Sequence, residues 1–312
     1  MWLQRFTDYI LRHRWKAVLL TFVVTFVPVI GIVGILIAAL ITLVKGAVEG
    51  AIYTVAATLP FIISFGISGT NGSATPLVVW AAVGVAVLSN ILTWVFAVML
   101  RRQTSWSVIL QIAALLGVLV VSVVHLAYPG VTDWWGSQLQ SYYNQAAAMT
   151  SSVLSNTAVA APNEAQLESI SVTRQYATGL MVAAVLFNAI LQLVVARWWQ
   201  VLIFSPGMLR RELHRIRLSH LAGILFLVSM AFSYLGNSVV LDIMPILYLL
   251  FGAAGLSLIH YLFGLMESST TWFWLSLMYI TLVIALPTSL LLVAFLALLD
   301  IWMDIRRRIR KV

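Results

Sequence analysis

Residues 17–44 read "AVLLTFVVTFVPVIGIVGILIAALITLV", a run without a single charged residue that is interrupted by Pro28, Gly31 and Gly34. About 20 apolar residues suffice to cross the hydrocarbon core of a bilayer, which is roughly 30 Å thick. The run is much longer than the apolar core of a signal peptide, which has about 7–15 residues. It is therefore expected to stay in the membrane, either as one kinked crossing or as a helical hairpin. Each half of a hairpin has about 14–16 residues and would be roughly 21–24 Å long.

The composition of the whole chain supports a membrane location. Hydrophobic residues make up 62% of the 312 positions and charged residues only 9%. Soluble globular domains are about 45–50% apolar, so a soluble core of this size would lack polar surface. The absence of cysteine excludes a disulfide framework and a thiolate metal site.

Further apolar segments follow the first run, and one of them is again broken by a proline. Residues 270–303 contain Pro287 and have the length of a second hairpin. Six other segments are predicted to cross the membrane once each, and they span residues 47–66, 76–100, 106–127, 175–196, 218–236 and 240–265.

The distribution of lysine and arginine decides between crossings and hairpins. If both broken runs cross once, ten basic residues lie on one side of the membrane and eight on the other. If both are hairpins, 17 of the 18 lie on one side and only Arg174 lies on the other. Basic residues in short loops concentrate on the cytoplasmic side, so the hairpins are favoured.

The predicted fold is an all-α polytopic membrane protein with a core of six helices, a short helical hairpin at each end and about ten membrane segments. Both termini are expected in the cytoplasm. Residues 1–16 are expected to form a basic amphipathic helix at the interface, residues 17–303 a single transmembrane domain, and residues 304–312 a basic tail.

The densest charge lies in residues 196–218, "ARWWQVLIFSPGMLRRELHRIRL". Ser205 and Pro206 are typical of a helix start, and residues 205–217 are predicted to form a cytoplasmic amphipathic helix. Trp198 and Trp199 would then lie in the aromatic belt of the membrane. The basic face is interpreted as an anchor to anionic lipid headgroups, or as a docking surface for a membrane or ATPase partner. Nucleic-acid binding is not expected, because no recognised motif accompanies the charge. The four arginines of this face are Arg210, Arg211, Arg215 and Arg217.

A long outer loop, residues 128–174, is the other conspicuous segment between membrane helices. Apolar residues from Trp135 to Val153 recur with helical spacing and predict an amphipathic helix. Asn163 and Gln166 form a capping-box pattern, which predicts a second helix that continues into the segment 175–196. The loop is interpreted either as a helix packed on the outer surface or as a lid over an outward-facing cavity.

Motifs for catalysis and cofactors are missing from the sequence. It contains no P-loop, no HExxH and no GxSxG pattern, and it has no cluster of histidines that would hold a metal. No catalytic residue, no metal and no cofactor is therefore predicted, and the protein is not expected to be an enzyme.

Polar residues inside the predicted membrane segments are the remaining functional signal, because such residues are costly in a bilayer. Amides often serve only to join helices through hydrogen bonds, and an acidic residue at a helix start is favoured by the helix dipole. These alternatives remain open. The candidates for ligand contact are Asp242, His125, Asn188, Asn90 and, from the outer loop, Trp135.

The stretches "LVKGAVEG" (43–50), "RRQTSW" (101–106), "ARWWQVLIFSPGMLRREL" (196–213) and "LLDIWMDIRRRIR" (298–310) carry a resemblance to a known family. The chain resembles the uncharacterised YybS-like membrane proteins of bacteria over nearly its whole length. That family is grouped with the six-helix S components of energy-coupling-factor transporters and with the rod-shape protein MreD. The resemblance implies an S-component-like core in the bacterial inner membrane.

Two classes of function remain open from the sequence. The first is a binding or transport-type subunit that holds a small hydrophobic molecule and depends on a separate ATPase. The second is a scaffold without transport activity that organises a cell-envelope assembly through residues 205–217 and the outer loop.

Overall fold

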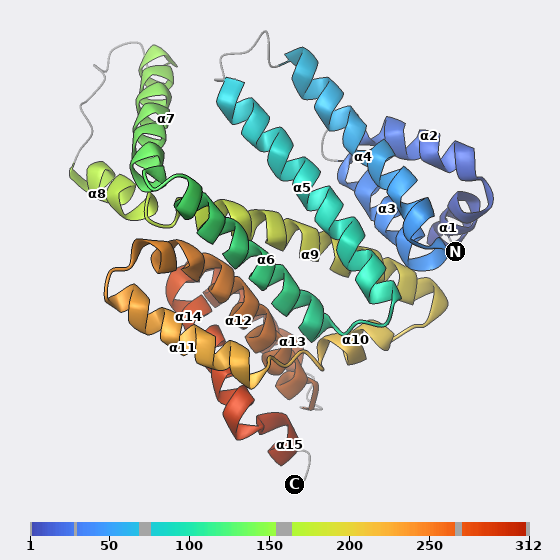
Figure 1. Cartoon of the computed structure of the whole chain (residues 1–312). Coiled ribbons are helices and arrows are strands. Elements are labelled where there is room, and N and C mark those ends of the chain that lie inside the picture. Colours follow the sequence, from blue (N-terminus) through green and yellow to red (C-terminus); the bar gives the residue numbers. More distant parts are fainter. Residues whose placement is uncertain (1, 28–29, 69–75, 154–163, 266–269, 310–312) are drawn as a thin grey trace.

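The computed structural model describes residues 2–27, 30–68, 76–153, 164–265 and 270–309 (Figure 1). These residues form α-helices and no β-strand, in agreement with the all-α prediction. Five helices are long and apolar enough to cross a membrane, namely α4 (Ala47–Ser68), α5 (Pro76–Arg101), α6 (Trp106–Ala127), α9 (Ala177–Phe204) and α12 (Ser238–Leu265). The shorter apolar helices are α3 (Ile32–Lys45), α11 (His220–Tyr234), α13 (Thr271–Ile284) and α14 (Leu286–Met303). The remaining helices are α1 (Trp2–Arg12), α2 (Arg14–Thr25), α7 (Val131–Val153), α8 (Glu164–Thr173), α10 (Met208–Leu213) and α15 (Ile305–Ile309).

Helix α11 is shorter than the predicted crossing at 218–236. Its 15 residues give a length of about 22 Å, below the roughly 30 Å of a hydrocarbon core. The side chain of Ser219 accepts a hydrogen bond from the amide of Ala222 and starts the helix, and Gly236, with φ of 77°, follows its end. Within the described residues, five helices are therefore long enough to cross a membrane, instead of the six that the sequence predicts.

The N-terminal run folds as a pair of helices, α2 and α3, that pack against each other. A Cβ on Gly34 would lie 2.1 Å from the hydroxyl of Thr25, so a larger residue would have to displace this side chain. Gly31 is similarly constrained, because its Cβ would lie 2.8 Å from the carbonyl oxygen of Thr25. Pro28, the third predicted breaker, lies outside the described residues.

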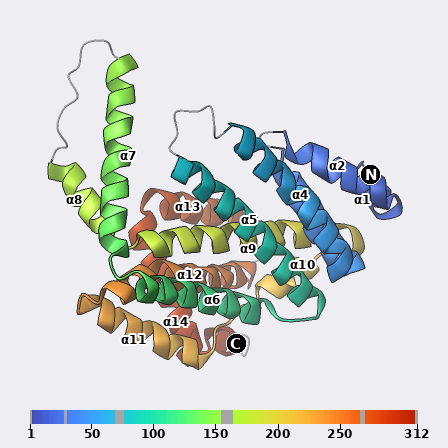
Figure 2. The same cartoon turned by 45° about the horizontal axis from the view of Figure 1, so that its top comes forward.

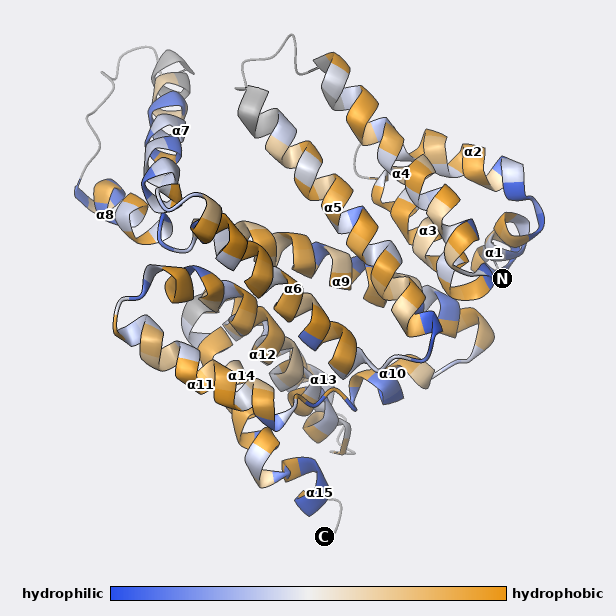
Figure 3. Cartoon of the chain, in the orientation of Figure 1, coloured by the Kyte–Doolittle hydropathy of each residue, from blue (hydrophilic) through white to orange (hydrophobic). Residues whose placement is uncertain are grey.

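The C-terminal run is also divided into two helices. α13 ends at Ile284 and α14 begins at Leu286, with Pro287 in the first turn of α14. Proline suits this position because its missing N–H would be unpaired there in any case. α14 packs along α12, and Figure 3 shows apolar residues concentrated on these membrane helices and hydrophilic ones on α7, α10 and α15.

The bundle has two apolar clusters that α9 connects. The larger one joins α5, α6, α9, α12 and α14, and α12 is the most deeply buried of the five long helices. The smaller one joins α1 to α4 and includes Trp199 of α9. Trp199 donates a hydrogen bond to the hydroxyl of Thr7 (2.9 Å) and stacks on Phe6. The prediction that Trp199 lies in an aromatic belt is wrong, because this side chain holds α1 in the protein, whereas Trp198 is exposed.

Helices α1, α10 and α15 lie toward one end of the bundle, which we call the cation-rich end (Figure 1). The ammonium group of Lys45 donates to the carbonyl of Leu11 (2.6 Å), and the guanidinium of Arg101 donates to the carbonyl of Leu43 (2.9 Å). Helices α7 and α8 lie toward the other end of the molecule (Figures 1 and 2).

Two predicted segment boundaries are wrong. The helix expected at 1–16 ends at Arg12, because the chain turns at His13 before α2 begins. α8 does not continue into α9, because residues 174–176 form a turn. In the predicted tail 304–312, Arg306 packs against the protein with 13% of its side chain exposed, whereas Arg307 and Arg308 are exposed. The predicted helix start at Asn163 lies outside the described residues.

Candidate functional site

The segment 205–217 does not form the long amphipathic helix that the sequence predicts. α10 covers only six residues, and it follows Gly207, which has a left-handed backbone (φ of 84°). Ser205 does not cap it, because it is the residue after the end of α9. Leu213 and Ile216 pack into the core, but beyond Leu213 the chain leaves the helix.

Long-range hydrogen bonds explain why the helix stops. The hydroxyl of Ser257 donates to the carbonyl of Leu213 (2.5 Å), and the guanidinium of Arg306 donates to the carbonyls of His214 and Ile216 (2.8 Å to Ile216). These carbonyls are satisfied by α12 and α15, so the segment is fixed to the C-terminal helices instead of lying free on the membrane surface.

Arg306 is held by a buried acidic partner. Its Nε lies 3.0 Å from a carboxylate oxygen of Asp300, of which only 3% is exposed. Burial lowers the pKa of the Arg306 guanidinium, and the charge of Asp300 partly offsets this effect. Arg217 is likewise paired, because it donates to the carboxylate of Asp304 (3.0 Å). Arg217 is therefore ion-paired within the protein while 34% of its side chain stays exposed, and its role in docking remains a prediction.

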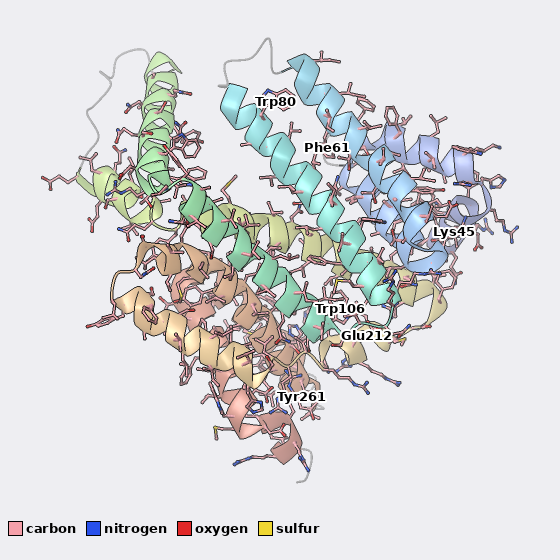
Figure 4. All side chains as sticks on the ribbon, in the orientation of Figure 1. Lys45, Phe61, Trp80, Trp106, Glu212 and Tyr261 are labelled. Atoms are coloured by element: carbon pink, nitrogen blue, oxygen red, sulfur yellow. The ribbon has the colours of Figure 1, made fainter. Side chains whose placement is uncertain are left out.

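The other predicted docking arginines remain on the surface. Arg210, Arg211 and Arg215 are exposed. Glu212, the acidic residue of α10, is engaged on one side of the helix, where it accepts hydrogen bonds from the indole of Trp106 (3.0 Å) and from Nε of Arg197 (3.2 Å). Trp106 and Glu212 are labelled at this contact in Figure 4. A net positive surface therefore remains around α10.

A pocket of about 580 Å³ lies behind α10, between α6, α9, α12 and α13. Its walls are mainly aliphatic and include Leu110, Val194 and Leu213. A second groove, of about 630 Å³, lies on the other side of Trp106, and Arg211 and Arg215 line it. Pockets of this size are typical of small-molecule sites.

Polar groups line one edge of the apolar pocket. They include Arg210 on α10, His214 directly after α10, His260 on α12 and Tyr279 on α13. The hydroxyl of Tyr279 lies 3.0 Å from Nε2 of His260, whose other ring nitrogen lies 2.8 Å from the carbonyl of Leu256. Burial lowers the pKa of His214 from its ordinary value of 6.5, and the nearby positive charge of Arg210 lowers it further. His260 and Arg306 lower the same pKa by smaller amounts.

Three of the predicted ligand residues meet at the opposite end of the bundle. His125 Nε2 lies 2.8 Å from Asp242 Oδ2, and both side chains are buried. Asp242 Oδ1 accepts a hydrogen bond from the amide of Gly179 (2.7 Å), and the indole of Trp135 donates to the hydroxyl of the adjacent Thr178 (3.0 Å). The carboxylate of Asp242 thus connects α6, α9 and α12, and its internal partners are sufficient to explain its burial.

The two predicted amides lie elsewhere. Asn90 is buried and donates to the hydroxyl of Thr58 (3.1 Å), which joins α5 to α4. Asn188 is half-buried on α9. Their contact with a ligand remains a prediction.

The sequence did not identify the edge formed by His214, His260 and Tyr279. Tyr279 and His260 lie on separate helices, and the spacing along the chain contains no sign of their contact. The only available signal was a histidine inside an apolar segment, which is unusual in membrane helices.

Comparison of the chain with family models, with curated proteins and with solved structures finds no match. Within the described residues, no group of three or more histidine, aspartate or glutamate side chains is placed to hold a metal ion.

Proposed function

We propose that the chain is a bacterial inner-membrane subunit that binds or helps to transport a small hydrophobic molecule and contains no ATPase of its own. The resemblance to the YybS-like family and to S components supports this proposal. The proposed topology has about ten membrane segments, an S-component-like core and both termini in the cytoplasm, so that the cation-rich end faces the cytosol.

One observation carries the proposal, namely the apolar pocket of about 580 Å³ behind α10. A soluble metabolite would find few polar partners on its aliphatic walls, whereas a hydrophobic molecule would bury apolar surface there, at about 25 cal/mol per Å². The pocket is near α10 and not near α7, so the site differs from the outward-facing cavity that the sequence suggested under residues 128–174. A lid function for that loop remains a prediction.

The proposal is tested by filling the pocket. Val194 lines it, and a Val194→Trp substitution should abolish the thermal stabilisation that a bound hydrophobic ligand confers on the purified protein. Leu191→Trp is the matched control, because Leu191 lies on the same helix with an exposed side chain. The measurement is a thermal-shift screen of fatty acids, isoprenoids and fat-soluble vitamins. Equal responses of both variants to every stabilising ligand would contradict binding in this pocket.

The scaffold function is the second candidate, and the exposed arginines favour it. Arg211 and Arg215 line the open groove next to Trp106, where an acidic segment of a partner could bind. Photo-crosslinking from residue 211 in native membranes distinguishes the two candidates. Recovery of ATPase subunits supports the transport-type subunit, and recovery of a single envelope-assembly protein supports the scaffold.

The proposed topology has its own test. Reporter fusions after residues 102 and 207 should be active only with a cytoplasmic reporter, and fusions after residues 150 and 238 only with a periplasmic one. A periplasmic signal at residue 102 would contradict the placement of the pocket.

A further inference from the structure

We propose that the occupant of the apolar pocket is an anionic phospholipid, with one acyl chain between α9 and α12 and its phosphate group on Arg210 and His214. This inference rests on the proposed binding function and adds the chemical class of the ligand.

The position of the pocket favours a molecule that enters from the bilayer. Trp198 and Leu202 of α9 and Tyr279 of α13 line the pocket and are exposed on the outside of apolar helices. A molecule in the membrane can therefore reach the pocket laterally. The aliphatic side chains behind this opening, from α6, α9 and α12, provide an environment for a hydrocarbon chain.

The charge at the edge of the pocket favours an anion. A Cβ built on Gly264 of α12 would lie 2.9 Å from an Nη of Arg210 and 3.1 Å from Cε1 of His214, which places both groups side by side against this glycine. Because Gly264 has no side chain, the two groups can approach α12 directly. Arg210 and His214 thus form a two-residue donor site next to the apolar walls.

The protein does not neutralise this site within the part of the chain that the structure describes. In those residues, no carboxylate forms an ion pair with Arg210. Glu212 is engaged by Arg197 and Trp106, and Asp300 by Arg306. An anionic headgroup would supply the missing negative charge, and a guanidinium offers paired N–H donors that suit a phosphate.

The combination of features indicates a lipid and not a free anion. A soluble phosphate would contact only the polar edge and would leave the aliphatic pocket empty. A zwitterionic lipid such as phosphatidylcholine would fill the pocket and bring a phosphate, but its choline group would add a positive charge close to Arg210. An anionic phospholipid satisfies both parts of the site.

The experiment compares two lipids that have the same acyl chains. Purified full-length protein in neutral detergent is titrated with palmitoyl-oleoyl phosphatidylglycerol or with palmitoyl-oleoyl phosphatidylcholine, and bound lipid is measured by native mass spectrometry. We expect phosphatidylglycerol to bind roughly fivefold more tightly, since one charged basic residue, Arg210, lies close to the headgroup and contributes about 1 kcal/mol. Arg210→Gln should remove most of this preference, and Arg210→Lys should restore part of it.

Two controls distinguish the site from general attraction between positive and negative charge. Arg211→Gln removes an exposed arginine of the same helix that lines the other groove, so it should leave the preference unchanged. Val194→Trp should reduce the binding of both lipids. If Arg210→Gln and Arg211→Gln weaken the preference equally, the attraction is spread over the surface and the inference is wrong.

Failure of the inference and failure of the proposed function give different results. Equal binding of the two lipids, with both lost in Val194→Trp, would overturn the anionic specificity and leave a hydrophobic site. Lipid binding that is unaffected by Val194→Trp would overturn the inference and also count against the proposed function.

Discussion

The contact between α9 and α12 at Gly179 allows a stability prediction whose size follows from the structure. A Cβ on Gly179 would lie 1.6 Å from the carbonyl oxygen of Asp242, whereas ordinary contact begins at 3.4 Å. Gly179→Ala therefore requires the two helices to separate locally by about 1.8 Å. Neither side can adapt by rotating a side chain, because the obstacle is backbone.

The separation would also break the hydrogen bond from the amide of Gly179 to Asp242, which is 2.7 Å long. Overpacking of a core costs about 1–3 kcal/mol, and the loss of a hydrogen bond to a charged group about 1.5–3 kcal/mol. We therefore expect Gly179→Ala to lower the free energy of unfolding by about 3–6 kcal/mol. The assay is reversible unfolding in mixed micelles, followed by circular dichroism.

Gly84→Ala provides the matched control, because a Cβ at Gly84 of α5 would meet nothing within 4 Å. Its effect should be below about 1 kcal/mol. A second test uses Asp242→Ala, which removes the acceptor of the same hydrogen bond. The effects of Gly179→Ala and Asp242→Ala should not add, since the two residues share one contact. Equal stability of Gly179→Ala and Gly84→Ala would refute the close crossing of α9 and α12.

Two further predictions concern the ion pairs and the histidine at the cation-rich end. Asp300→Asn leaves the largely covered Arg306 without its buried partner and should cost about 3–5 kcal/mol of unfolding free energy. Asp304→Asn affects a more exposed pair and should cost below about 1 kcal/mol. Similar losses in the same micelle assay would contradict the difference in burial between the two pairs. The lowered pKa of His214 means that the folded state resists protonation, so stability contributed by the neutral ring is present above pH 6.5 and is lost as the pH falls below it. Arg210, His260 and Arg306 all oppose a positive charge on His214. Thermal unfolding in neutral detergent at pH 7.5 and at pH 5.5 should show that His214→Gln loses less stability on acidification than the parent protein. An identical loss of stability would show that His214 does not carry this pH dependence.

The sequence predicted the membrane helices and the first hairpin well, because their determinants are local. Apolar runs of sufficient length and the glycines near residue 31 act within one segment, and the close approach at Gly34 is a direct consequence of the missing side chain. The boundaries of α5, α6 and α12 agree closely with the expected segments for the same reason.

The segment 205–217 was mispredicted because its conformation depends on distant residues. The spacing of Leu209, Leu213 and Ile216 is helical, but Arg306, about 90 positions later in the chain, binds the carbonyls of His214 and Ile216. No periodicity within the segment contains this information.

The outer-end residues illustrate a partial success. His125 and Asp242 were each identified as costly in a membrane, but their contact joins positions that are 117 residues apart. The sequence therefore identified the residues without identifying the pair, and it gave no sign of the pocket behind α10.

The contact of Trp199 with Thr7 has a consequence for the order of events during synthesis. The two residues are 192 positions apart, and ribosomes add about 5–20 residues per second, so α1 exists for roughly 10 to 40 s before its binding surface on α9 has been made. During that interval Trp2 and Phe6, which stack on each other, give the N-terminal helix an aromatic face that can rest among lipid headgroups. A newly made chain would thus keep its first helix at the bilayer surface and exchange lipid for Trp199 only after most of the molecule has entered the membrane.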